Sequence, residues 1–189
     1  MNTKHIVALL FLTLTWNFML AQEKEADGVF GKTINVAAGL GYYRYVGYPV
    51  QIIHADYELQ IDRNLTAAPF ITMYSYNSSQ VWGDLNTSYR KYDYSETAIP
   101  IGIKVSYYLD DLVNAASQWD FYFSGSLGYV FRKTIWETAY DGKKEINPGM
   151  GPLYLDVHSG AEFHVTKPLG LTLDVSLTMA TLGIAVHLP

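Results

Sequence analysis

The sequence predicts an all-β protein: a single eight-stranded antiparallel up-and-down barrel that spans a membrane after removal of a signal peptide. Three observations predict this fold class. Apolar and polar side chains alternate along about eight segments, which is the periodicity of β-strands. The polar faces of these segments are rich in Gly, Ser, Ala and Thr, and the two long polar connections fall on the side opposite two tight turns, although 46–49 and the connection near Met179 are short.

The composition of the 189 residues excludes several other classes of protein. Hydrophobic residues make up 49% and charged residues only 16%, whereas a disordered chain needs high charge and few aromatic residues. The absence of cysteine excludes a disulfide scaffold, thiol catalysis and cysteine-ligated zinc. The formal net charge of −5 leaves no positive footprint, so we expect no nucleic-acid partner.

Residues 1–21 have the order of features expected of a secretory signal peptide. Lys4 precedes an apolar run, and the small residue Ala21 ends the segment. This run is too short for a comfortable membrane span. Residues 22–29 are mostly charged or small, residues 22–30 are expected to form an N-terminal lead, and residues 31–189 are expected to form the barrel.

In the first half of the barrel, alternation is clearest in segment 50–61. Apolar residues from Ile53 onward occupy one face, and His54, Asp56 and Glu58 occupy the other. The segment before it alternates Ile, Val and Leu with Asn, Ala and Gly. The segment after it contains a proline and alternates less cleanly, whereas the fourth has Ile or Val at every odd position from 99 to 105. In order, the predicted strands are 32–45, 50–61, 65–76 and 96–109.

The second half of the chain contains four further alternating segments. Large residues, many of them aromatic, occupy most odd positions from 119 to 131, and Ser, Gly and Asp are frequent at the even ones. The sixth segment alternates Leu and Val with Asp and His, and the seventh alternates Leu and Val with Thr, Asp and Ser. The last alternates Leu, Ile and Val with Thr, Gly, Ala and His. In order, the predicted strands are 119–132, 153–165, 169–177 and 181–188.

The composition of the two faces predicts which one points inward. Small polar residues suit a narrow interior, and large apolar residues with aromatic ends suit a band in contact with lipid. We therefore expect the polar face to line the barrel and the apolar face to contact the membrane. A soluble secreted protein, built as two sheets or as a lipocalin-like barrel, would have the opposite arrangement.

The connections support this orientation. Residues 62–64 and 166–168 form tight turns on one side, whereas 77–95 and 136–151 form long polar segments on the other. Outer-membrane barrels have short periplasmic turns and longer extracellular loops. Eight strands bring both termini to the side of the short turns.

Three stretches carry a resemblance to a known family: Leu20-Ala21-Gln22, Ala98-Ile99-Pro100-Ile101-Gly102-Ile103 and Gly125-Ser126-Leu127-Gly128-Tyr129. On these, the chain resembles the small eight-stranded outer-membrane β-barrel proteins of Gram-negative bacteria, especially the outer membrane protein beta-barrel domain family of Bacteroidetes. The resemblance covers essentially the whole chain after the signal peptide and is architectural. It implies a location in the cell outer membrane with both termini in the periplasm. It also implies contact with outer-membrane lipid, lipopolysaccharide and the outer-membrane insertion machinery.

The inward faces are expected to carry a network of charged residues. Seven carboxylates are accompanied by only two permanent cations, and unpaired buried charge is costly. We therefore predict that Lys104 pairs with the central carboxylates, that Arg132 lies near Asp156, and that the histidines neutralise part of the remainder. The thirteen residues of this network are His54, Asp56, Glu58, Glu96, Lys104, Asp120, Arg132, Asp156, His158, Glu162, His164, Asp174 and His187.

The segment YRKYDY is the candidate for contact with a surface ligand. Tyr89, Arg90, Lys91, Tyr92 and Tyr94 combine basic groups that bind phosphate with aromatic rings that stack on sugars. We expect them to lie in the loop 77–95. The alternative is an aromatic girdle with solvated charges.

These observations predict a structural or surface ligand-contacting role without catalysis. The spacing of the interior His and Asp residues would also suit metal binding or nucleophile activation, but we interpret them as lumen filling and predict no metal site and no cofactor. No nucleophile motif such as G-x-S-x-G occurs. The alternatives are a narrow cation-preferring channel, a small-molecule or lipid carrier, a soluble lipocalin-like barrel and a lipid-modifying outer-membrane enzyme. The sequence identifies no protein partner.

Overall fold

The computed structural model describes residues 31–41, 49–82, 89–109, 118–136 and 152–189. The predicted signal peptide and N-terminal lead lie outside these ranges, as do most of the predicted loop 136–151 and the segment 110–117. Within the described ranges, no helix is long and apolar enough to cross a membrane.

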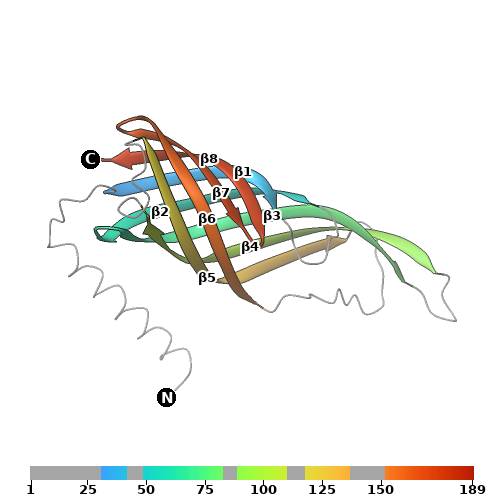
Figure 1. Ribbon diagram of the computed structural model, residues 1–189. Helices are drawn as coiled ribbons and strands as arrows, with labels where there is room; N and C mark the ends of the chain where they lie inside the picture. Colours follow the sequence, from blue (N-terminus) through green and yellow to red (C-terminus); the bar gives the residue numbers. More distant parts are fainter. Residues whose placement is uncertain (1–30, 42–48, 83–88, 110–117, 137–151) are drawn as a thin grey trace, which may run out of the picture.

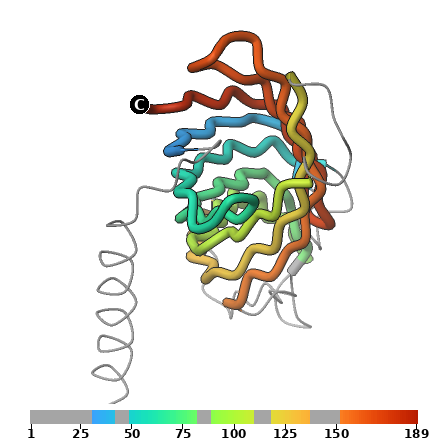
Figure 2. The backbone as a smooth tube through the Cα atoms, turned by 60° about the vertical axis from the view of Figure 1, so that its left-hand side comes forward, coloured from blue at the N-terminus to red at the C-terminus, as the bar shows by residue number. Residues whose placement is uncertain are grey.

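The described residues form eight antiparallel strands in one closed barrel (Figures 1 and 2). Each strand pairs with its neighbours in sequence, and the last pairs with the first. The prediction of an eight-stranded up-and-down barrel is therefore confirmed. The strands are β1 Lys32–Gly41, β2 Val50–Asp62, β3 Leu65–Trp82, β4 Arg90–Tyr108, β5 Trp119–Trp136, β6 Leu153–Thr166, β7 Leu169–Ser176 and β8 Met179–Leu188.

Pairing between β1 and β8 closes the barrel. Lys32 lies opposite Leu188 and Gly41 lies opposite Met179, so the register is continuous over all of β1. Closure removes the two unpaired edges that an open sheet would expose. It also brings the start of β1 and the end of β8 to the same end of the barrel, which we call the terminal end; the opposite end is called the hairpin end.

Alternation along each strand separates an interior polar face from an exterior apolar face, as predicted. Asp56, Lys104 and His158 are 4%, 5% and 2% exposed, whereas Leu127 and Leu155 on the outside are 57% and 63% exposed. The small inward residues explain this arrangement, because the interior of an eight-stranded barrel is just wide enough for side chains to fill.

Three strands are much longer than predicted from the sequence. β3, β4 and β5 have 18, 19 and 18 residues, whereas β7 has 8, and β3 and β4 project beyond the other strands in Figure 1. The prediction that 77–95 is a loop is wrong, because β3 continues to Trp82 and β4 starts at Arg90, with these two residues paired. The outward residues of this extension are mostly polar, so it has no apolar face by which sequence alternation could reveal a strand.

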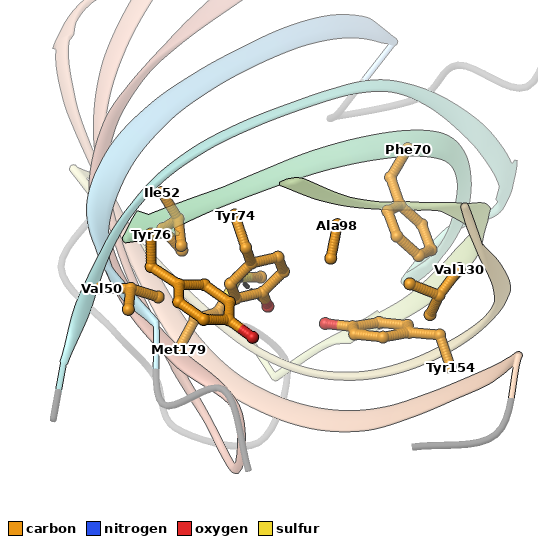
Figure 3. Packing of buried hydrophobic residues seen from close by; sticks show 9 residues of the cluster. All are labelled: Val50, Ile52, Phe70, Tyr74, Tyr76, Ala98, Val130, Tyr154 and Met179. Atoms are coloured by element: carbon orange, nitrogen blue, oxygen red, sulfur yellow. Dashed lines mark hydrogen bonds between the residues drawn. The ribbon is translucent and has the colours of Figure 1, made fainter. Parts of the chain in front are cut away.

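Aromatic and aliphatic side chains fill the interior toward the hairpin end (Figure 3). Side chains from different walls of the barrel point into the interior and pack on one another, and the rings of Phe70 and Tyr154 lie 5.6 Å apart. Met179, which follows the β7–β8 turn, is 2% exposed and belongs to this cluster. The cluster comprises Val50, Ile52, Phe70, Tyr74, Tyr76, Ala98, Val130, Tyr154 and Met179.

Candidate functional site

The thirteen ionisable residues predicted for the interior all lie on the inward faces of the strands. Nine of them are buried: His54, Asp56, Glu58, Glu96, Lys104, Asp156, His158, Glu162 and Asp174. The other four, Asp120, Arg132, His164 and His187, are half-buried. Each of the four histidines contacts a carboxylate, at 2.5 to 3.1 Å for the shortest contact of each.

Lys104 and Asp56 form the central ion pair of the interior. Lys104 on β4 reaches across β3 to Asp56 on β2, and the residue opposite Lys104 on β3 is the small, fully buried Ala68. Asp56 also accepts a hydrogen bond from Asn35 Nδ2 at 2.8 Å and contacts His54 Nε2 at 3.1 Å. The pair is therefore enclosed and hydrogen-bonded, as a buried ion pair needs to be.

Neutral donors surround the next carboxylate, Glu58. It accepts hydrogen bonds from the hydroxyls of Thr66 and Tyr108, the latter at 3.0 Å, and from Asn35 Nδ2 at 3.3 Å. The Lys104 ammonium also lines the same small cavity as the carboxylates of Glu58 and Asp174. One cation thus serves three carboxylates, and hydroxyl groups supply the remaining hydrogen bonds.

Asp174, His158 and Ser126 form a row with the connectivity of a serine-hydrolase triad. His158 Nδ1 lies 2.8 Å from Asp174 Oδ1, and its Nε2 lies 3.0 Å from Ser126 Oγ. Tyr122 donates a second hydrogen bond to Asp174 at 2.8 Å. The row is closed to a substrate, because Ser126 and His158 are 5% and 2% exposed. This geometry supports a structural role, since a nucleophile needs space for the reacting atom of the substrate.

Asp156 lies toward the hairpin end, where it binds the β7–β8 turn. It accepts hydrogen bonds from Tyr154 at 3.1 Å, from Ser176 at 2.6 Å and from Thr178. The prediction that Arg132 lies near Asp156 is wrong. The β5–β6 register places Asp156 opposite Ser126, six positions along β5 from Arg132, and Arg132 therefore lies nearer the hairpin end.

The centre of the barrel has almost no free space. The described residues around Lys104 enclose a cavity of about 20 Å³, which is room for about one water molecule. Toward the hairpin end, the aromatic cluster of Figure 3 occupies the interior. Tyr108, Tyr122 and Tyr154 donate hydrogen bonds to interior carboxylates, and sequence reasoning did not identify them as such partners.

The predicted surface-contact residues do not form one group. Tyr92 and Tyr94 lie on the inward side of β4 and are half-buried, and the Tyr94 ring packs 4.8 Å from that of Trp136. Tyr89, Arg90 and Lys91 are exposed at the tip of the extension. These residues therefore lie on or beside a paired strand and not in a long loop.

A shallow groove runs along the outside of the same extension. Its volume is about 760 Å³. Most of its lining residues have outward, exposed or half-buried side chains on β3, β4 and β5, and most are polar. The lining residues are Asn77, Ser78, Ser79, Asp93, Tyr94, Ser95 and Ile135.

Comparisons with known proteins give similarities to solved structures. No protein-family model and no curated protein matches the chain. The chain is similar to a de novo designed transmembrane β-barrel, with 12% identity and a TM-score of 0.47 over 82% of this chain and 95% of that chain. It is similar to Ail, the attachment invasion locus protein of Yersinia pestis, in complex with the heparin analogue sucrose octasulfate (7% identity, TM-score 0.47, 83% and 96% covered). It is also similar to Neisserial surface protein A (13% identity, TM-score 0.49, 83% and 96% covered). With identities this low, these similarities carry no information about function, and the predicted Bacteroidetes family stays a prediction.

Proposed function

We propose that this protein is a non-conducting barrel of the outer membrane that presents its β3–β4 extension at the cell surface to anionic ligands. The observation that carries the proposal is the contrast between the apolar exterior of the barrel and the polar exterior of the extension. The proposed role is non-catalytic. It implies outer-membrane lipid, lipopolysaccharide and the insertion machinery as partners.

The apolar exterior supports a position in a membrane. Outward Leu, Ile, Val and aromatic side chains are found on every strand, and Val157 and Leu155 are more than 60% exposed. Soluble monomers rarely expose contiguous apolar patches larger than a few hundred Å². In lipid the same surface is favourable, and a closed barrel also satisfies every strand's backbone hydrogen bonds.

The height of this belt matches a bilayer. On β5 the outward aromatic residues run from Trp119 at one end to Phe131 at the other. The Trp119 ring lies 4.9 Å from that of Phe163, and the Phe131 ring lies 5.0 Å from that of Tyr129. Twelve residue steps span about 40 Å along a strand, which corresponds to about 30 Å across the membrane at a tilt of about 40°. Aromatic residues at both ends of an apolar band are typical of outer-membrane barrels.

The filled interior supports a closed barrel over the alternative of a channel. The central cavity of about 20 Å³ is bordered by the Lys104–Asp56 pair, and the aromatic cluster follows it toward the hairpin end. In planar bilayers we therefore expect no stable single-channel conductance. A steady, cation-selective current would favour the channel.

The extension beyond the belt supports contact with anionic groups. On β3 the outward residues change from Ile71 and Met73 to Ser75, Asn77 and Ser79. At the tip and on the neighbouring strand, Arg90, Lys91 and Lys133 are exposed bases, and Asp93 is an exposed acid between them. Because Lys and Arg bind phosphate groups, we propose the phosphates of lipopolysaccharide as the ligand.

Single-cysteine labelling tests the location and orientation, because the chain has no cysteine of its own. The variants are Ser79→Cys on the extension and Lys167→Cys in the β6–β7 turn, both at exposed positions. A membrane-impermeant maleimide added to intact cells should label Ser79→Cys, and should label Lys167→Cys only after the outer membrane is permeabilised. The reverse pattern would refute the orientation, and equal labelling in a detergent-free soluble extract would refute the membrane location.

Binding to purified lipopolysaccharide tests the proposed ligand. The double variant Arg90→Ala and Lys91→Ala should bind several-fold more weakly, and the difference should shrink as salt is raised. Lys167→Ala removes one exposed charge at the opposite end of the barrel and is the control. If the double variant binds as well as the unmodified protein, the extension is not the binding surface.

A further inference from the structure

Two histidines and a glutamate of the interior network meet at the terminal end of the barrel, away from the Lys104–Asp56 pair. His164 on β6 and His187 on β8 have ring centroids 5.1 Å apart. Glu162 Oε1 lies 2.6 Å from His187 Nε2 and 3.8 Å from His164 Nδ1. One ligand-type atom from each residue lies within 4.8 Å of the other two.

A glycine on the intervening strand allows this meeting. Gly170 on β7 lies opposite His164 on one side and opposite Ala185 on the other. A Cβ atom at position 170 would collide with the carboxylate of Glu162. Because β7 contributes no side chain here, groups from β6 and β8 come together above its backbone.

Each histidine is held by a second partner through its other ring nitrogen. His164 Nε2 contacts Asp120 Oδ2 at 2.5 Å, and His187 Nδ1 lies 2.9 Å from Thr33 Oγ1. The remaining ring nitrogens, Nδ1 of His164 and Nε2 of His187, lie 3.8 Å and 2.6 Å from the same oxygen of Glu162. Metal-binding histidines are typically oriented by a carboxylate, a backbone carbonyl or water that holds the nitrogen not bound to the metal, and Asp120 supplies such a carboxylate here.

We propose that Glu162, His164 and His187 bind a divalent transition metal ion, with Zn²⁺ the best match, and that Asp120 and Thr33 orient the two histidines. Two imidazoles and a carboxylate are a ligand set that zinc uses, at bond lengths of about 2.0–2.2 Å. Such bonds place ligand atoms roughly 3.3 Å apart in a tetrahedron. The three atoms thus need side-chain movements of no more than about 1.5 Å, the largest being the approach of the two histidine nitrogens, since the three ligand atoms start within 4.8 Å of one another.

The surroundings suit an exchangeable ion. The side chains of His164 and His187 are 25% and 16% exposed, and that of Glu162 is 5% exposed, so an ion can enter from the terminal end. The carboxylates of Glu162 and Asp120 favour a positive charge there. Three protein ligands leave a fourth position for water. Because Glu162 and His164 lie on β6 and His187 lies on β8, a bound ion would link these two strands across β7.

Zinc titration of the full protein in detergent, after treatment with a chelator, tests the site. A competing chromogenic chelator should report one Zn²⁺ per chain. His164→Gln and His187→Gln should each weaken binding at least 100-fold, and Asp120→Asn should weaken it 10- to 100-fold, the range typical of residues that orient a ligand. His54→Gln is the matched control, because His54 also contacts an interior carboxylate but, among the described residues, does not belong to the Glu162–His164–His187 group; it should leave zinc affinity unchanged.

A spectroscopic measurement keeps the test decisive if a variant fails to fold. Pulsed electron paramagnetic resonance of the unmodified protein loaded with one equivalent of Cu²⁺ should show two coordinated imidazoles. A signal from one imidazole or none would overturn the proposal. The absence of zinc binding at micromolar concentrations would also overturn it, and Glu162 and Asp120 would then serve only to pair with the histidines. Zinc binding that persists when both histidines are replaced would overturn it as well.

Discussion

Replacing Lys104 by Met should destabilise the barrel more than any change at an exposed lysine. Met keeps most of the side-chain volume and removes the charge, which leaves Asp56 buried with its hydrogen bonds to Asn35 and His54 but without the lysine ammonium. The two charged side chains are 6% and 1% exposed. At an effective dielectric constant of about 20, two unit charges roughly 3 Å apart attract each other by about 5 kcal/mol. Breaking a buried pair costs about 3–5 kcal/mol, and we expect a loss in this range.

Urea unfolding from lipid vesicles, followed by tryptophan fluorescence, measures this loss. Lys133→Met is the control, because Lys133 is exposed on the outside of β5 and should change the unfolding free energy by no more than about 0.5 kcal/mol. The double variant Lys104→Met and Asp56→Asn should lose about 2–3 kcal/mol less than the sum of the single variants. If Lys104→Met costs no more than Lys133→Met, the interior is not held together by this ion pair.

Three further outcomes follow from the same geometry. Ile103→Lys places a charge in the apolar belt and should lower the unfolding free energy by about 2–4 kcal/mol in the same assay. Ser79→Lys on the polar extension should change it little, and equal losses would mean that the belt does not lie in lipid. Gly170→Ala should destabilise the barrel by about 1–3 kcal/mol because its Cβ collides with the Glu162 carboxylate. Gly125→Ala is the control, because a Cβ at this position meets nothing within 4 Å. If Gly170→Ala leaves the unfolding free energy unchanged, the Glu162 side chain moves freely. The buried Ser-His-Asp row should not react with a fluorophosphonate probe, and stoichiometric labelling of the serine would mean that the row is open to substrate.

Much of the fold could be predicted because a barrel wall imposes a period of two on its residues. Segment 50–61 alternates so regularly that its inward residues, including Asp56 and Glu58, were placed correctly without any knowledge of its neighbours. The same period placed the thirteen predicted Asp, Glu, Lys, Arg and His residues on the inward faces of the described strands. Lys104 could be predicted as the partner of the central carboxylates because, on the strands that the structure describes, it is the only permanent cation in the middle of an inward face.

Other features depend on contacts between residues far apart in the sequence, and no local pattern encodes them. The extension of β3 and β4 has mostly polar outward residues, so only their pairing with each other, up to Trp82 and Arg90, defines them as strands. Asp156 binds Thr178 because the β7–β8 turn brings Thr178 into the interior.

The meeting of His164 and His187 required the closed barrel. Twenty-two intervening residues separate the two histidines in sequence, and a period of two says only that each points inward. Their approach depends on the registers of β6 with β7 and of β7 with β8, and on the missing side chain of Gly170 between them. Register is set by turn geometry and by packing of all eight strands together. The sequence therefore predicts which residues face the lumen, and the three-dimensional pairing of the strands selects which of them become neighbours.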